Sequence, residues 1–168
     1  MAGRSSTRAG TPDLIKAHVL IIEARYHEAI ADQLAAGAIA EIEAAGATFE
    51  RVMVPGALEI PQVLASAVGA GLIPSDAGDG RYDGAVALGC VIRGETTHYE
   101  TVCHESNRWL MDVAIRHGVP VGNGILTVEN EAQAVARAQG GRQSKGADAA
   151  RACLTLIAHA RAFEELAE

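Results

Sequence analysis

The amino-acid sequence predicts an α/β fold in which helices cover both faces of a four-stranded parallel sheet. Four short apolar runs alternate with stretches of helical periodicity, which gives the order β-α-β-α-β-α-β-α-α. The run Gly84–Ile92 is almost wholly apolar, as is typical of a parallel strand buried on both sides. The 168 residues, 49% of them apolar, contain no repeats and suffice for one full-sized core.

The first half of the chain predicts two strand–helix pairs. Strands are expected at residues 18–23 and 47–54, and helices at 28–45 and 58–70. Apolar residues recur at helical spacing in the first helix, at Ile30, Leu34, Ile39 and Ile42. Gly46 stands where the residue after a helix end belongs. Pro61 suits the first turn of the second helix, because its missing N–H would have no partner there.

The second half predicts two strands and three helices after a loop at 71–82, which holds Pro74, Gly78 and Gly80. Strands are expected at 84–92 and 119–128, helices at 98–117, 131–138 and 145–166, and a polar segment at 139–144. Gly118 should end the helix that precedes it. The core-facing side of that helix is predicted to carry Val102, Trp109, Val113 and Ile115.

Charge and hydropathy exclude several classes of function. The net charge of −7 argues against a nucleic-acid surface, because phosphates would be repelled. No apolar run approaches the roughly 20 residues of a membrane span, and residues 1–12 lack the apolar stretch of a secretory signal. We therefore expect a flexible tail at 1–12, a single domain at 13–168, and a soluble cytoplasmic protein that binds neither nucleic acid nor membrane.

Cysteine and histidine spacing predicts neither a disulfide framework nor a metal site. The three cysteines, Cys90, Cys103 and Cys153, form no C-x-x-C and are expected to be small buried hydrophobes rather than nucleophiles. No metal-ligand spacing is shared by His27, His104, His117 and His159. The motifs G-x-G-x-x-G, G-x-x-x-x-G-K-[ST] and G-x-S-x-G are absent, which argues against dinucleotide, nucleoside-triphosphate and serine-hydrolase chemistry.

Open parallel sheets bind ligands beyond the carboxyl ends of their strands. The predicted strands therefore nominate four segments: 24–27, 54–59, 91–98 and 123–127. In the second of these, two prolines bracket Gly56 and Glu59 in a stiff turn before a helix. Its backbone N–H groups could hold a polar ligand; alternatively, Glu59 supplies a favourable charge at the helix start.

The segment 91–100 carries the clearest pattern. Gly94 permits close approach, and the N–H groups of a helix start beside Thr96 and Thr97 suit an anion such as phosphate. His98 could transfer protons there near neutral pH. The alternative is a threonine cap followed by a solvated histidine.

Basic residues gather late in the chain. Arg137, Arg142 and Lys145 make this segment basic, whereas the chain as a whole is acidic, which suits a phosphate-binding arm. The alternative is a solvated loop. Arg93, at the end of a predicted strand, is more typical of an ion pair than of an anion ligand.

Several segments in register resemble one known family. They are Val54-Pro-Gly-Ala-Leu-Glu-Ile-Pro61, Gly89-Cys-Val-Ile-Arg-Gly-Glu-Thr-Thr-His98 and Gly124-Ile-Leu-Thr-Val-Glu-Asn130, followed by Arg137 and Ser144-Lys-Gly146. From about residue 15 to 163, the chain resembles the lumazine synthase (6,7-dimethyl-8-ribityllumazine synthase) family. The resemblance implies a flavodoxin-like, three-layer αβα sandwich with a four-stranded parallel sheet of order 2-1-3-4.

The resemblance also implies an activity, a transferase reaction that uses neither metal nor organic cofactor. It condenses the small-molecule substrates 5-amino-6-(D-ribitylamino)uracil and 3,4-dihydroxy-2-butanone 4-phosphate to the lumazine, phosphate and water, the penultimate step of riboflavin biosynthesis. Family sites lie between the subunits of a homopentamer, and a functional link to riboflavin synthase follows.

The resemblance implies a role for each residue that matches the family pattern. His98 would transfer protons, and Tyr26 would stack on the pyrimidine ring. The ring and ribityl chain would contact Ala57, Leu58, Glu59, Cys90, Val91, Ile92 and Asn123. The phosphate would be bound by Glu95, Thr96 and Thr97, and by Arg137 and Lys145 of a neighbouring subunit.

Two departures from the family pattern bear on the site. Asn123 stands where the family often has an aromatic residue, and Glu95 where many members have a small one, so we expect the Glu95 side chain to point away from the phosphate. Pro12 and the segment 139–144 differ from shell-forming members, which favours an isolated pentamer over a decamer or a sixty-subunit shell.

Two other classes of function compete with the enzyme. A non-catalytic member would bind flavins or lumazines without needing His98 together with Arg137, so their co-occurrence favours catalysis. A flavodoxin-like response or electron-transfer domain would need acidic phosphoacceptors or a phosphate loop after the first strand, which Glu23-Ala-Arg-Tyr26 does not supply.

Overall fold

The structure, a computed structural model, describes residues 14–74 and 80–168 and has one four-stranded parallel sheet in this part of the chain. The strands are β1 (His18–Ala24), β2 (Thr48–Val54), β3 (Gly84–Ile92) and β4 (Val121–Val128), in the order β2-β1-β3-β4. The helices are α1 (Glu28–Ala44), α2 (Glu59–Gly69), α3 (His98–His117), α4 (Glu131–Ala138), the short 3-10 helix η1 (Gly141–Gln143) and α5 (Lys145–Ala167). The predicted fold class and strand order are confirmed.

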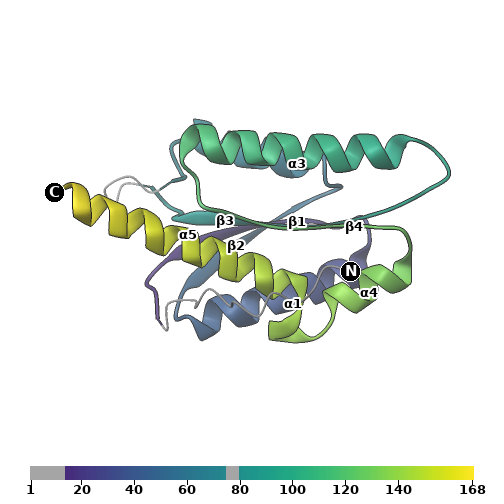
Figure 1. Cartoon of the computed structure of the whole chain (residues 1–168), viewed down its shortest axis with the longest axis horizontal. Helices are drawn as coiled ribbons and strands as arrows, with labels where there is room; N and C mark the ends of the chain where they lie inside the picture. The colour runs from purple at the N-terminus through teal and green to yellow at the C-terminus, as the bar shows by residue number, and fades with distance from the viewer. Residues whose placement is uncertain (1–13, 75–79) are drawn as a thin grey trace.

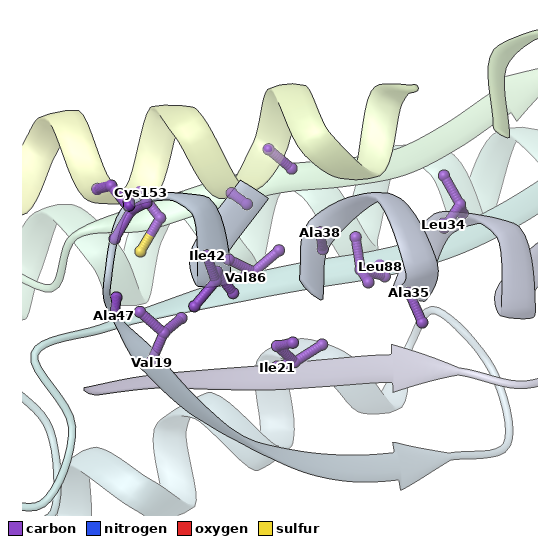
Figure 2. Close-up of a cluster of buried hydrophobic side chains, with 14 of the residues drawn as sticks. Val19, Ile21, Leu34, Ala35, Ala38, Ile42, Ala47, Val86, Leu88 and Cys153 are labelled. Atoms are coloured by element: carbon purple, nitrogen blue, oxygen red, sulfur yellow. The ribbon is translucent and has the colours of Figure 1, made fainter. Parts of the chain in front are cut away.

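Helices cover both faces of the sheet, which makes three layers (Figure 1). The helices α1, α4 and α5 pack on one face, and α2 and α3 on the other. The alternation of side chains along a strand divides β1 between two cores: Val19 and Ile21 face α1, whereas Leu20 and Ile22 face α2. Figure 2 shows the first core, in which Val19, Ile21, Val86 and Leu88 lie beneath Leu34 and Ile42. The buried residues of both cores are almost all aliphatic, with Tyr82 an aromatic member of the second core.

The predicted boundaries of β3, α3 and α4 are confirmed, and most others differ by one residue. The largest shift is in the fourth strand, which begins at Val121 rather than Val119. The Val119 N–H donates to the carbonyl of Ala114 and so still belongs to the end of α3, and Pro120 has no N–H for a ladder. Gly46 and Gly118 adopt the left-handed conformation expected of residues that end helices, with φ of 75° and 63°.

The predicted inner face of α3 is partly wrong. Trp109 is 45% exposed and Ile115 is 76% exposed, whereas Val102, Ser106, Leu110 and Ala114 form the buried stripe. These four lie at a spacing of four residues, so the helix is rotated from the predicted orientation. Trp109 instead lines a shallow groove between α2 and α3, where its indole N–H donates to Glu105.

Three further expectations concern membrane spans, the first residues of the chain and the cysteines. Of the helices in residues 14–74 and 80–168, none is both long and apolar enough to cross a bilayer. The predicted tail at 1–12, with Pro12, lies outside the described residues. Cys153 is fully buried, whereas Cys90 and Cys103 are half-buried, and all three are free thiols.

Candidate functional site

A cleft of about 450 Å³ opens at the carboxyl ends of β1, β2 and β3. Three of the four nominated segments, 24–27, 54–59 and 91–98, meet there, and the fourth, 123–127, does not line it. The side chains and backbone of fifteen residues line the cleft: Tyr26, His27, Pro55, Gly56, Ala57, Leu58, Glu59, Cys90, Val91, Ile92, Gly94, Thr96, His98, Tyr99 and Val102. Neighbouring strands of a parallel sheet end at the same edge, which brings these distant segments together.

One wall of the cleft is the loop after β1, which presents Tyr26. The Tyr26 ring is 78% exposed and packs edge-on against His27, with 5.0 Å between ring centroids. The loop is tied to the neighbouring segment, since the Arg25 N–H donates to the carbonyl of Val54 at 3.0 Å. An open aromatic face on an anchored loop suits a flat ring.

A buried carboxylate on β1 anchors this loop through hydrogen bonds. Glu23 on β1 is fully buried, and Arg51 donates two hydrogen bonds to it, at 2.6 and 2.9 Å. Arg25 donates to the same carboxylate at 3.1 Å and to Asp32 on α1 at 2.6 Å. The two arginines compensate the desolvation of the carboxylate, and Arg25 thereby connects the loop to both β1 and α1.

Removing that carboxylate should destabilise the protein. Glu23→Ala deprives both arginines of their shared partner, and we expect a loss of about 2 kcal/mol in the free energy of unfolding. Asp32→Ala removes only the exposed partner of Arg25 and should cost less than about 1 kcal/mol. Urea unfolding of the two variants beside the wild type measures the difference; equal losses would contradict the central place of Glu23.

A second side of the cleft is formed by the turn between β2 and α2. The Gly56 N–H donates to the Glu59 carboxylate at 2.9 Å, and the Glu59 N–H donates to the Gly56 carbonyl at 3.2 Å. Glu59 therefore closes the turn and places negative charge in the first turn of α2, the simpler of its two predicted roles. Ala57 and Leu58, buried and half-buried, lie within this turn and line the cleft with their neighbours.

The last residues of β3 form the floor of the cleft. Cys90, Val91 and Ile92 are half-buried there. Burial raises the pKa of the Cys90 thiol to about 11, so at neutral pH it stays protonated. That state agrees with the expectation that the cysteines are not nucleophiles.

Gly94 to His98 form the open rim of the cleft at the start of α3. All five residues are exposed, and the His98 N–H donates to the Thr96 hydroxyl at 3.3 Å. Thr97 precedes the helix without a side-chain capping bond, which leaves other N–H groups of the first turn available to a ligand. Glu95 and Thr97 do not line the cleft, whereas Gly94, Thr96 and His98 do.

Arg93 is engaged in ion pairs, as predicted. Its guanidinium pairs with Glu129 at 2.7 Å and with Glu100, and it lies 4.4 Å from the centre of the Tyr99 ring. Both carboxylates are in position to neutralise it, and the pKa of Glu100 is lowered chiefly by its hydrogen bond from Arg93. Arg93 therefore ties the rim to the segment after β4.

Three predicted site residues lie away from the cleft of their own chain. The Asn123 amide N–H donates to the Asn107 side chain at 2.6 Å, between β4 and α3. Arg137 on α4 donates to the carbonyl of Gln133, and Lys145 at the start of α5 pairs with Asp148 at 3.4 Å. The helices α4 and α5 pack on the opposite face of the sheet from α2 and α3 (Figure 1).

Four side chains that line the cleft were not among the predicted site residues: His27, Pro55, Tyr99 and Val102. His27 and Pro55 are inside nominated segments, and Tyr99 and Val102 follow His98 by one and four residues on α3. Helical spacing from His98 was the available signal for Val102. Within residues 14–74 and 80–168, no group of three or more His, Cys, Asp or Glu side chains is arranged to hold a metal ion.

Comparison with known proteins identifies one family. The family model for 6,7-dimethyl-8-ribityllumazine synthase matches residues 16–161. A 6,7-dimethyl-8-ribityllumazine synthase of Azorhizobium caulinodans is 53% identical over 154 residues, which cover 92% of each chain. One from Methylobacterium radiotolerans is 52% identical, covering 92% of this chain and 88% of the relative, and one from Agrobacterium fabrum is 52% identical, covering 84% and 93%. The chain therefore belongs to the 6,7-dimethyl-8-ribityllumazine synthase family.

Proposed function

We propose that this chain condenses 5-amino-6-(D-ribitylamino)uracil with 3,4-dihydroxy-2-butanone 4-phosphate, forming 6,7-dimethyl-8-ribityllumazine and releasing phosphate and water. One observation carries the proposal. The same cleft is lined by an open aromatic face, Tyr26, and by Gly94, Thr96 and His98 at the start of α3. A ring-bearing substrate and a phosphorylated one can therefore meet within a single cleft.

The ring and the ribityl chain would occupy the side of the cleft near Tyr26. The Tyr26 ring would stack on the pyrimidine, and polar backbone groups would bind its edges and the hydroxyls of the chain. These groups belong to two segments that line the cleft, Ala57, Leu58 and Glu59 after β2, and Cys90, Val91 and Ile92 at the end of β3. Backbone groups held by a turn and a strand lose little conformational freedom on binding, which favours positioning of the ring.

The phosphate would lie at the start of α3. N–H groups of a first helical turn favour an anion. The Thr96 side chain lines the cleft, and the Thr97 hydroxyl would assist it, as the resemblance implies. Glu95 would contribute its backbone N–H alone. Bound there, the phosphate would be close to the His98 imidazole.

His98 would transfer protons during the reaction. The free amine of the pyrimidine attacks the ketone carbonyl and loses water as an imine forms; phosphate leaves, and the ribityl-bearing nitrogen closes the second ring with loss of another water. Each stage moves a proton, and an imidazole side chain can both accept and donate one. Positioning and the anion site would supply most of the remaining acceleration.

Arg137 and Lys145 would complete the phosphate site from a second copy of the chain. Both lie away from the cleft of their own chain, so a site that uses them with His98 needs a neighbouring protomer. We propose the homopentamer that the resemblance implies, with Asn123 near the substrate ring across the same interface, and a cytoplasmic location. The lumazine product would be passed to riboflavin synthase, which accounts for the proposed functional link.

The test of the proposed function is turnover with both substrates. Purified protein should convert them to a product with lumazine absorbance, with equal amounts of phosphate released, and neither substrate alone should react. Lumazine binding without turnover would support the non-catalytic alternative and contradict the proposal. Phosphate release without lumazine absorbance would contradict it as well.

Removing the Glu95 carboxylate should have little effect on the phosphate site. Because Glu95 does not line the cleft, Glu95→Ala should change the KM for the phosphorylated substrate by no more than about twofold. Thr96→Val, which deletes a hydroxyl inside the cleft, should raise that KM clearly. A large gain in affinity from Glu95→Ala would instead show that the carboxylate repels the phosphate.

A further inference from the structure

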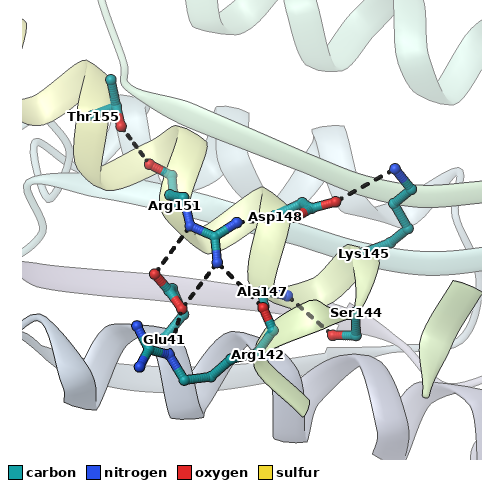
Figure 3. Close-up of polar contacts among 8 residues, drawn as sticks. All are labelled: Glu41, Arg142, Ser144, Lys145, Ala147, Asp148, Arg151 and Thr155. Atoms are coloured by element: carbon teal, nitrogen blue, oxygen red, sulfur yellow. Dashed lines mark hydrogen bonds and ion pairs between the residues drawn. The ribbon is translucent and has the colours of Figure 1, made fainter. Parts of the chain in front are cut away.

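A second buried carboxylate lies outside the cleft, on α1. Glu41 is 2% exposed and belongs to a helix that carries none of the residues lining the cleft. Two arginines from later segments of the chain converge on it, Arg142 in η1 and Arg151 in α5 (Figure 3). The sequence separations are 101 and 110 residues, so the contact joins α1 to the last third of the chain.

The two arginines hold Glu41 in its charged form. Arg142 Nε donates to one carboxylate oxygen at 2.9 Å, and Arg151 Nε donates to the other at 3.1 Å. Burial raises the pKa of Glu41, but the hydrogen bonds from Arg142 and Arg151 outweigh burial and lower its pKa overall. Arg151 also donates to the backbone carbonyl of Arg142 at 3.2 Å, which fixes the η1 turn directly.

From Arg151 a chain of charged groups runs to Lys145. Arg151 Nη1 donates to one oxygen of Asp148 at 3.0 Å, and the other oxygen of Asp148 lies 3.4 Å from Lys145 Nζ. Figure 3 shows these contacts along one side of the first turns of α5. Charges therefore alternate in sign from Glu41 through Arg151 and Asp148 to Lys145.

The turn 139–144, next to these charged groups, packs closely against α1. A Cβ on Gly37 of α1 would lie 1.9 Å from the Ser144 hydroxyl oxygen and 2.8 Å from the Gly141 carbonyl oxygen. The same Ser144 hydroxyl caps α5 by accepting from the Ala147 N–H at 3.2 Å. The turn 139–144 therefore packs directly on α1. It connects α4, which bears Arg137, to α5, which bears Lys145.

We propose that Glu41 is a positioning residue for the phosphorylated substrate: through Arg142 it anchors the turn between Arg137 and Lys145, and through Arg151 and Asp148 it orients the Lys145 ammonium. This inference rests on the proposed function, in which Arg137 and Lys145 reach the phosphate in a neighbouring protomer. Glu41 touches no substrate. A long lysine side chain loses much rotamer freedom when it binds an anion. If Lys145 is already ordered by Asp148, the entropy cost of binding the phosphate is smaller.

The test compares two matched substitutions on one helix. Glu41→Gln keeps the shape of the side chain and removes its charge. It should raise the KM for 3,4-dihydroxy-2-butanone 4-phosphate by about fivefold and leave the KM for the pyrimidine substrate unchanged. Glu43→Gln, two residues along α1 at an exposed position, should change neither KM. A rise of both KM values together, or of neither, would overturn the proposal.

A double substitution separates positioning from general loosening of the fold. If Glu41 acts through Lys145, adding Glu41→Gln to Lys145→Ala should raise the KM for the phosphorylated substrate much less than it does in the wild type. An undiminished effect in that background would contradict the proposed path.

Hydrogen exchange tests the same idea without turnover. Glu41→Gln should speed exchange in peptides spanning 139–148, and Glu43→Gln should not. Unchanged exchange after Glu41→Gln would contradict the anchoring of the turn. If the wild-type protein bound but did not convert the substrates while exchange responded as expected, the proposed function would fail and the anchoring would stand.

Discussion

Mixed oligomers assembled from His98→Ala and Arg137→Ala subunits are expected to regain about a quarter of the wild-type activity, because random pairing joins the two unmodified faces at one interface in four. Each variant alone should be nearly inactive. Loss of the proton-transferring group should lower kcat by roughly a hundredfold or more, and loss of the guanidinium should weaken the phosphate site. Recovery on mixing requires that one site draw His98 and Arg137 from different copies of the chain.

The experiment starts from separately purified variants, which are unfolded, mixed in equal amounts and refolded. Lumazine absorbance then measures the activity of the mixture against each variant refolded alone. A mixture of His98→Ala with a second His98 variant, His98→Gln, is the matched control and should stay inactive. If the first mixture also stayed inactive although its subunits had exchanged, sites shared between protomers would be ruled out.

Gly146→Ala is expected to destabilise the fold by about 3 kcal/mol or more, at the upper end of overpacking effects. A Cβ at this position would lie 2.0 Å from the Leu34 carbonyl oxygen and 2.8 Å from its carbonyl carbon. These are backbone atoms of α1, which cannot rotate away as a side chain would. The helix α5 would therefore have to move off α1, and with it the Ser144 cap and the start of the helix that bears Lys145.

Gly69→Ala is the matched control for that substitution. Gly69 is also helical, at the end of α2, and a Cβ there would have no atom within 4 Å. Because alanine is the better helix former, this variant should be as stable as the wild type or more stable by up to about 1 kcal/mol. Urea unfolding at one protein concentration compares them, since association contributes to the stability of an oligomer. Equal stability of the two variants would contradict the close approach of α1 and α5.

Local sequence patterns were sufficient where an element contains its own signals. The apolar run of β3 has glycine at its start, and α3 begins after two threonines and ends at Gly118, so both were predicted with the observed boundaries. Trp109 was misplaced because helical periodicity leaves the orientation of a helix open by about one residue. Only the packing of α3 on α2 and the sheet determines that Leu110 and Ala114, rather than Trp109 and Ile115, face inward.

Parts of the candidate site were likewise predictable from the sequence, and other parts were not. Segments 24–27, 54–59 and 91–98 were found from the sequence because parallel strands all end at one edge of the sheet. Arg93 was correctly expected in ion pairs, although its partners, Glu100 and Glu129, were not named. Glu23 and Glu41 gave no signal at all, since an isolated glutamate in an apolar run or on a helix is unremarkable until its arginines are known.

The sequence by itself determined the order of strands and helices, the edge of the sheet where the cleft opens and the family to which the chain belongs. These follow from periodicity, turn residues and short motifs, all of which act over a few neighbouring residues. Only the tertiary structure decided which charges are buried and paired, because Glu23 meets Arg51 across 28 residues and Glu41 meets Arg151 across 110. Ion pairs of that kind depend on which distant segments the fold brings within about 3 Å, and on how little water remains between them.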